Sequence, residues 1–225
     1  MGEKNKFFNV QEVNHTGVIK KLVEESSPRK SFLLMIFISS VIATLGLLND
    51  SGAVVIGAML VAPLLWPILG VSMGVLVWDW KMIKLSLFSI LLAIIIAVVT
   101  AIIITFFYVP LGASSEILRQ TNFGFMFPVA IAAGAAAAFA ICYDSLKEAV
   151  SGIAISVALL PPLVTIGIGL GGSDWKLMRS ALELFGINLA GVILTAFIIF
   201  AALDFSRYTR AVETAVKKEE KILKS

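Results

Sequence analysis

Residues 85–108 read LSLFSILLAIIIAVVTAIIITFFY, an unbroken apolar stretch. An α-helix rises 1.5 Å per residue, so a helix of this length crosses the hydrocarbon core of a bilayer, which is about 30 Å thick. A second such block, SFLLMIFISSVIATLGLL, fills residues 31–48. Both stretches predict helices that span a membrane.

The whole composition agrees with this interpretation. Hydrophobic residues make up 59% of the 225 residues and charged residues only 15%, which is too apolar for a water-soluble surface. We therefore expect an all-α integral membrane protein with about six transmembrane helices. The apolar blocks place these spans at 31–48, 52–77, 84–108, 123–143, 149–171 and 185–204.

The basic residues indicate the orientation. Most of them would lie on one side of a six-span chain: Lys20, Lys21, Arg29, Lys30, Lys81, Lys84, Lys147, Arg207, Arg210, Lys217, Lys218, Lys221 and Lys224. The other side would hold only Arg119, Lys176 and Arg179. Basic residues favour the cytoplasmic side, so we expect a multi-pass protein of the cytoplasmic membrane with both termini in the cytoplasm.

The segments outside the spans are short. Residues 1–30 form a weakly amphipathic N-terminal tail with no apolar core, so the first span is expected to serve as the insertion signal. Residues 109–122 form an extracytoplasmic loop. Residues 205–225 are expected to continue the last span as a charged cytoplasmic helix, and His15 is expected on the surface of the N-terminal tail.

Several classes of function are not indicated. Cys142 is the only cysteine, and the spans contain no histidine, so we expect no disulfide, no metal site, no cofactor and no catalytic residues. The basic residues lie in tails and short loops, which argues against nucleic acid as a partner. The expected partners are membrane lipids and a small solute or ion, and small-residue helix faces also permit a homo-oligomer.

The sequence contains an internal repeat. An offset of 95 positions aligns VIGAMLVAPLLWPILGVSMGVLVWDWK, from Val55, with VSGIAISVALLPPLVTIGIGLGGSDWK, from Val150, and about 14 of 50 residues are then identical. Three spans per copy form a first repeat at 31–108 and a second at 123–204. Because three is odd, the second copy would enter the membrane upside down, which predicts a 3+3 inverted-topology repeat.

Prolines interrupt one span in each copy. Pro63 and Pro67 lie in the second span, and Pro161 and Pro162 lie in the fifth. Proline removes a backbone donor, and the resulting break in a membrane helix persists where it lines a cavity or is covered by protein. Two broken helices in corresponding positions predict a binding site near the bilayer midplane, although the prolines could instead only kink a compact bundle.

Polar residues near the membrane are the remaining site candidates. Asn49, Asp50 and Ser51 form a tight turn between the first two spans, and Asp144 and Ser145 follow the fourth span. The carboxylates are candidates for ion or proton sites, or alternatively helix N-caps. Asn188, within the sixth span, is either a site residue or a hydrogen-bonding contact between helices.

The run NDSGAVVIGAMLVAPLLWPILG, from Asn49 to Gly70, resembles the signature of a family of prokaryotic membrane proteins known as domain of unknown function 389. The resemblance covers roughly residues 30–205. It implies a prokaryotic membrane protein but no established activity.

Function therefore rests on the residues. The leading hypothesis is a transporter or permease for a small solute or ion that binds at the proline-broken helices. An ion channel is an alternative, as is a structural or regulatory membrane protein that transports nothing. An enzyme is not favoured, because no nucleophile and base are predicted to meet inside the membrane.

Overall fold

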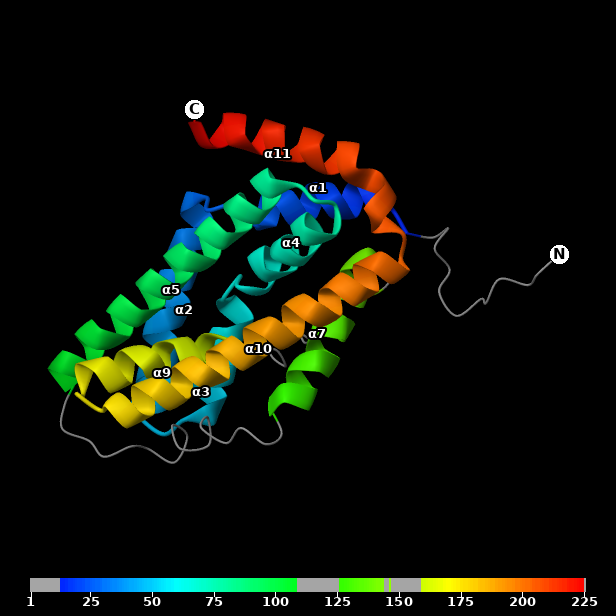
Figure 1. The fold of residues 1–225 in the computed structure, drawn as a ribbon. Helices are drawn as coiled ribbons and strands as arrows, with labels where there is room; N and C mark the ends of the chain where they lie inside the picture. Colours follow the sequence, from blue (N-terminus) through cyan, green and yellow to red (C-terminus); the bar gives the residue numbers. More distant parts are fainter. Residues whose placement is uncertain (1–12, 109–125, 144–145, 147–158, 225) are drawn as a thin grey trace.

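The computed structural model describes residues 13–108, 126–143, 146 and 159–224 of the chain. Every regular element in these ranges is helical, which confirms the predicted all-α class. In chain order the elements are α1 (His15–Glu25), α2 (Lys30–Leu48), α3 (Gly52–Val61), α4 (Leu65–Leu76), α5 (Trp80–Tyr108), α7 (Met126–Cys142), α9 (Leu160–Gly171), α10 (Trp175–Ala202), the 3-10 turn η4 (Phe205–Tyr208) and α11 (Thr209–Lys224) (Figure 1).

Three of these helices, α2, α5 and α10, are long and apolar enough to cross a membrane. Helices α3 and α4 make a fourth candidate span when taken together, and they meet at an angle of 51°. Phe37, Leu91 and Ile198 are among the large apolar side chains exposed on the outer faces of the long helices. Such faces are solvated by lipid rather than by water, so the chain is a membrane protein.

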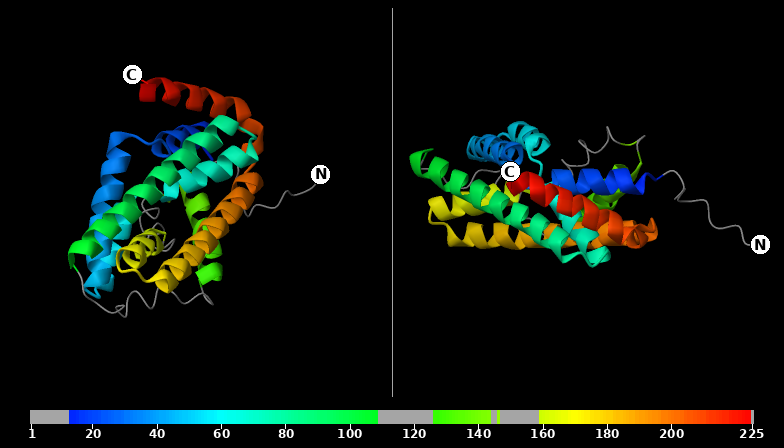
Figure 2. Two further views of the ribbon diagram at one scale, coloured as in Figure 1. Left: turned by 60° about the vertical axis from the view of Figure 1, so that its left-hand side comes forward. Right: turned by 90° about the horizontal axis from the view of Figure 1, so that it is seen from above.

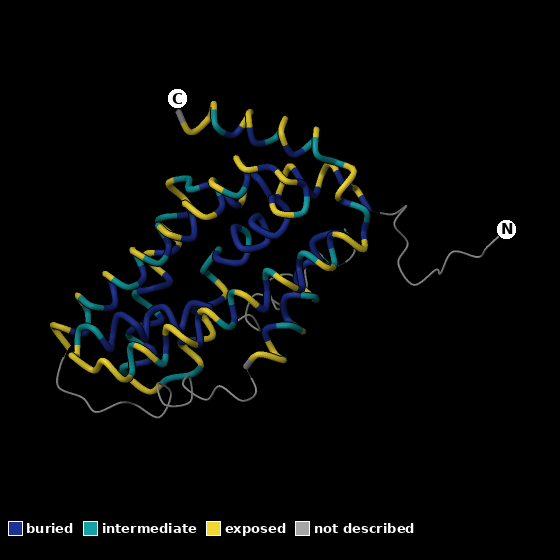
Figure 3. The backbone as a smooth tube through the Cα atoms, viewed as in Figure 1, coloured by how far each residue is buried: buried dark blue, intermediate teal, exposed yellow. Residues whose placement is uncertain are grey.

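The centre of the bundle is formed by two short helices, α4 and α9. Each has 12 residues and is therefore about 18 Å long, too short to cross a bilayer alone. Both pack against α5 and α10. All residues of α9 from Leu160 to Gly169 are buried, as are nine of the 12 residues of α4 (Figure 3). The long helices thus shield both short helices from lipid.

Small residues allow the close packing around α9. A Cβ atom on Gly167 would lie 2.5 Å from the carbonyl oxygen of Val98 and 2.5 Å from the Cβ of Ala101, both on α5. Further along, a Cβ on Gly171 would lie 3.0 Å from the Cβ of Thr105. The backbones of α9 and α5 therefore approach as closely as they do only because α9 has glycine at these positions.

Helix bounds recur at a fixed spacing along the chain. Helices α4 and α9 begin at Leu65 and Leu160, and helices α5 and α10 begin at Trp80 and Trp175, so each pair starts 95 positions apart. The packing follows the same spacing, because α2 packs on α5 while α7 packs on α10.

The turns that end α4 and α9 also have matching geometry. Trp78 has φ 56° and Ser173 has φ 57°, a left-handed conformation that is uncommon outside glycine. In the next position, the Asp79 carboxylate accepts a hydrogen bond from the Met82 backbone N–H, at 2.8 Å. At the start of α10, the Asp174 carboxylate likewise accepts a hydrogen bond from the Leu177 backbone N–H, at 2.9 Å. Each aspartate thus caps the long helix that follows it.

These two turns lie at opposite ends of the molecule. The turn at Trp78 borders a cavity with Thr209 and Lys217 of α11. The turn after α9 lies beside the last residues of α5, since Gly171 is packed on Thr105. Figures 1 and 2 show the same separation along the bundle.

Helices α1 and α11 pack together across one end of the bundle (Figures 1 and 2). From the sequence, residues 205–225 are expected to continue the last span. The chain instead turns at Asp204, where φ is 62°, and α11 folds back over α1. His15 is also not on the surface. It is 8% exposed, its Nε2 lies 2.9 Å from the carbonyl oxygen of Leu203, and its ring stacks on Tyr208.

Candidate functional site

The polar turn between α2 and α3 lies on the surface. Asn49 and Asp50 are exposed, and the Asn49 side-chain amide donates to the carbonyl of Leu45 at 2.8 Å. Asp50 has φ 54°, and the Ser51 N–H donates to the carbonyl of Gly46, so this turn ends α2 in the same way that Trp78 ends α4. Asp50 therefore has a structural role in ending a helix.

The alternative prediction for this turn is that a polar side chain caps the start of the next helix, α3. Ser51 occupies the N-cap position of α3 but makes no capping hydrogen bond with its side chain. Asp144 and Ser145, the predicted counterparts in the second repeat, lie outside the described residues.

Pro63 lies in the break between α3 and α4. It has no N–H to donate to the carbonyl of Met59, one turn earlier, so α3 ends and the chain bends. Pro63 and Val61 line a cavity of about 320 Å³ that also contacts Glu24, Glu25 and Arg29. The bend is thus adjacent to a polar cavity beneath α1.

The other three prolines among the predicted site residues lie in the first turns of helices, and they are buried. Pro67 is the third residue of α4, and Pro161 and Pro162 are the second and third residues of α9. The first N–H groups of a helix have no partner within it, and burying them without partners costs free energy. Proline has no N–H at all, so these residues let both helices begin inside the bundle at a lower cost.

Asn188 lies in the middle of α10 and is 2% exposed. The Ser72 hydroxyl of α4 donates to the carbonyl of Ile193 on α10, at 3.0 Å. Both helices run toward the end of the bundle where α11 lies (Figure 1). Pro67 and Asn188 each precede this contact by five residues, which places them at about the same depth.

The predicted site residues therefore fall into two groups. Pro67, Pro161, Pro162 and Asn188 are buried in the interior, and Pro63 lies at the nearby bend. Asn49, Asp50 and Ser51 lie apart, in the turn at the end of α2 away from Lys30. The interior group is the candidate site.

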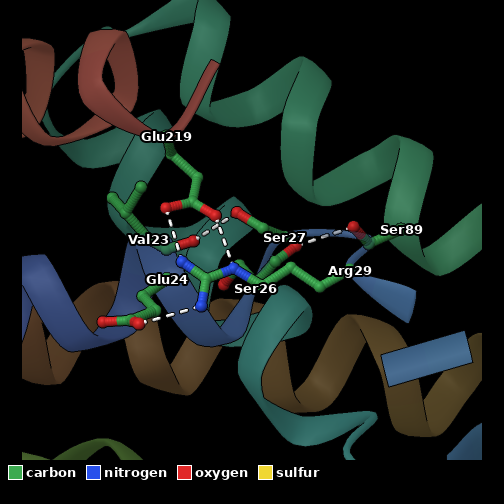
Figure 4. Close-up of polar contacts among 7 residues, drawn as sticks. All are labelled: Val23, Glu24, Ser26, Ser27, Arg29, Ser89 and Glu219. Atoms are coloured by element: carbon green, nitrogen blue, oxygen red, sulfur yellow. Dashed lines mark hydrogen bonds and ion pairs between the residues drawn. The ribbon is translucent and has the colours of Figure 1, made fainter. Parts of the chain in front are cut away.

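A network of charged and polar side chains that was not predicted from the sequence lies beneath α11 (Figure 4). Arg29 donates through Nε and Nη2 to both carboxylate oxygens of Glu219, at 2.7 and 2.8 Å, and through Nη1 to Glu24, at 2.9 Å. These contacts, the hydrogen bond to Glu219 first, raise the pKa of Arg29 above its ordinary value. The Arg29 guanidinium therefore stays protonated in this network.

Serines extend the same network into the bundle. The Ser26 hydroxyl donates to the carbonyl of Trp66, at 2.9 Å, and the Ser89 hydroxyl donates to the carbonyl of Ser26, at 2.7 Å. These bonds tie the end of α1 to the beginning of α4 and to α5. One sequence signal was available, since Val212, Val216 and Glu219 share the buried face of α11 at helical spacing.

Within the part of the chain that the structure describes, no three His, Cys, Asp or Glu side chains lie close enough together to hold a metal ion. The interior site instead offers backbone groups at helix ends, the Asn188 amide and the hydroxyl groups of Ser72 and Thr165. The Thr165 hydroxyl donates to the carbonyl of Pro161, at 2.8 Å. Groups of this kind bind a small polar solute or an ion without covalent chemistry.

A family model described as "Domain of unknown function (DUF389)" matches residues 59–194. The chain is also similar to the uncharacterized protein MJ0678 of Methanocaldococcus jannaschii, with 33% identity over 181 residues. That alignment covers 80% of this chain and 56% of the relative, so the chain spans about half the length of the curated relative it matches. No solved structure shows a significant match.

Proposed function

This chain belongs to the DUF389 family of domains of unknown function, and we propose that it is a transporter or permease for a small solute or ion. The observation that carries the proposal is the pair α4 and α9. Both are short, buried helices that begin at prolines inside the bundle, at positions 95 residues apart. Discontinuous helices that start near the membrane midplane form the substrate sites of many transporters.

The proposal includes a 3+3 inverted repeat with six crossings. The recurring helix bounds, the matched turns at Trp78 and Ser173, and the location of these turns at opposite ends of the bundle all support it. A two-fold axis in the membrane plane would exchange α4 with α9 and α5 with α10. Such a pair supplies two nearly equivalent arrangements, one open to each side of the membrane.

The basic residues support an orientation with both termini in the cytoplasm. Lys20, Arg29, Lys81 and Arg210 belong to α1, α11 or the helix ends beside them. Lys176 and Arg179, at the start of α10, are at the other end. By the positive-inside rule, the end of the bundle covered by α1 and α11 lies on the cytoplasmic side of the cell membrane.

The solute would bind at the depth of Pro67, Asn188 and the Pro161–Pro162 pair. The cavity lined by Pro63 also contacts Glu24 at the end of α1, so it lies on the side of the bend that faces α1. The prolines also leave few free amide donors at the start of α9. The Asn188 amide would therefore be a main polar contact for the solute.

A flux assay tests this proposal. Proteoliposomes with the purified chain are screened for uptake of a panel of labelled small solutes and inorganic ions, and Asn188→Leu is then compared with the parent protein. We expect saturable uptake of at least one compound and a loss of about tenfold or more in the variant, because a buried polar contact to the solute is removed.

Glu183→Gln is the matched control, because Glu183 lies on the exposed face of the same helix. Its uptake should equal that of the parent. The proposal is wrong if no compound in the panel is taken up, or if Asn188→Leu transports normally. Uptake that does not saturate, together with single-channel currents in a planar bilayer, would identify a channel instead.

A further inference from the structure

A groove with an unusual charge arrangement runs between α1 and α11. Its volume is about 700 Å³, and its charged lining consists of Lys20, Glu24, Arg29, Arg210, Lys218 and Glu219. It is separate from the interior site, so an inference about it does not depend on the proposed transport function.

The two carboxylates of this α1–α11 groove share one guanidinium, and the four cations of the lining outnumber them, which leaves a net charge of +2. Both accept hydrogen bonds from Arg29, and the Glu219 side chain is only 6% exposed. Among the described residues, by contrast, Lys20, Arg210 and Lys218 have no carboxylate oxygen within 4.0 Å. The groove therefore presents three cations that the protein does not pair, and an anion fits them.

The rest of the lining is mainly apolar. It consists of Val23, Ala211, Ala215 and Ile222, together with Thr16 and Thr214. A hydrated inorganic ion gains nothing from aliphatic surface. An amphiphile does, because its phosphate contacts the cations while its glycerol and first acyl carbons cover the apolar side chains.

The groove also lies at the depth where lipid headgroups are expected. Trp80, at the same end of the bundle, is 64% exposed, and the Lys84 ammonium lies 5.7 Å from its ring centre. Tryptophan with nearby lysine is typical of the boundary between lipid and water.

We propose that the α1–α11 groove binds the headgroup of an anionic phospholipid, held by Lys20, Arg210 and Lys218. Arg29 is a positioning residue, because it fixes Glu219 and so keeps α11 seated on α1. The bound lipid links the two terminal helices and couples their packing to the composition of the surrounding leaflet.

Lipid titration of the full chain in detergent, followed by native mass spectrometry, tests the proposal. Phosphatidylglycerol should bind the parent protein, and phosphatidylcholine should bind much more weakly. In the variant Lys20→Gln/Arg210→Gln/Lys218→Gln, binding of phosphatidylglycerol should weaken roughly 100-fold, given the contribution of each basic residue near an anionic lipid.

The control is Lys176→Gln/Lys217→Gln/Lys221→Gln, which removes the same charge outside the groove and should bind like the parent. Equal weakening in both variants would mean non-specific attraction and would overturn the proposal. So would unchanged binding in the first variant, or displacement of the lipid by millimolar inorganic phosphate. If the triple variant does not fold, the single variant Lys218→Gln should still bind about fivefold more weakly, and parent-like binding there counts against the groove.

Discussion

Arg29 holds two carboxylates at once, and its planar guanidinium makes this possible. Its Nε and Nη2 groups meet both oxygens of Glu219, while Nη1 meets Glu24. The partner Glu219 lies 190 positions away in the sequence and is nearly buried. One residue between α1 and α2 therefore fixes the position of the last helix of the chain.

Replacing Arg29 with lysine should destabilise the protein by about 1–2 kcal/mol. The charge remains, but an ammonium group cannot form the two parallel hydrogen bonds to Glu219. Thermal unfolding of the purified protein in detergent measures the effect. Arg179→Lys is the control, because the pair of Arg179 with Glu183 is largely exposed, and its loss should change stability by less than about 0.5 kcal/mol. An equal effect of both substitutions would contradict the special role of Arg29.

Ser173 is a second residue whose backbone conformation has a testable consequence. At φ 57° its backbone is in the left-handed region, which is unfavourable for a residue with a Cβ atom, and glycine adopts this conformation freely. Ser173→Gly should therefore raise the stability by about 0.5–1 kcal/mol, measured as an increase in the unfolding temperature. Ser173→Ala keeps the strain and should give no such increase. A gain with alanine but not with glycine would argue against this conformation.

At the scale of elements, the contact between α9 and α5 depends on glycine. Gly167→Ala places a methyl group 2.5 Å from the Val98 carbonyl oxygen, so the two helices must move apart. We expect a loss of about 1–3 kcal/mol in detergent unfolding experiments, as is usual when a tightly packed site receives an extra carbon.

Gly186→Ala serves as the matched control for this contact. A Cβ atom on Gly186 would meet nothing within 4 Å, and alanine favours a helix more than glycine does. This variant should be as stable as the parent or slightly more stable. If Gly167→Ala behaves in the same way, the close packing of α9 on α5 is wrong.

At the scale of the whole molecule, the proposed inverted repeat predicts where the two matched turns lie. Trp78→Cys and Ser173→Cys, each made in a Cys142→Ala background, place one thiol in each exposed turn. A membrane-impermeant thiol reagent added outside intact cells should label position 173 but not position 78. The reverse pattern should appear in inside-out vesicles. Labelling of both positions from the same side would rule out the inverted topology.

Much of the fold could be predicted from the sequence, because lipid leaves a chain few options. A long apolar run must satisfy its backbone hydrogen bonds internally, so it forms a helix. The extents of α2 and α5 follow from this directly. The starts of α4 and α9, Leu65 and Leu160, are separated by the same 95 positions as the aligned sequences, and an aspartate caps the helix that follows each of them.

The candidate site was predicted less completely. Pro67, Pro162 and Asn188 are buried in the interior as expected, since prolines and amides inside apolar helices need protein cover. Asp50 lies in the exposed turn that ends α2, where a short polar side chain tolerates the left-handed conformation, and its role as an ion site stays a prediction. A carboxylate that terminates a helix and one that binds an ion look alike in a sequence.

The sequence by itself determined that this protein is a bundle of helices solvated by lipid and where α2 and α5 lie along the chain. These properties depend on local backbone chemistry and on the length of each apolar run. Only the tertiary structure decided that α11 folds back over α1, that Arg29 meets Glu219, and that His15 is buried beside Tyr208. Such pairings depend on which helix faces meet after packing, and residues nearly 200 positions apart carry no local signal of that outcome.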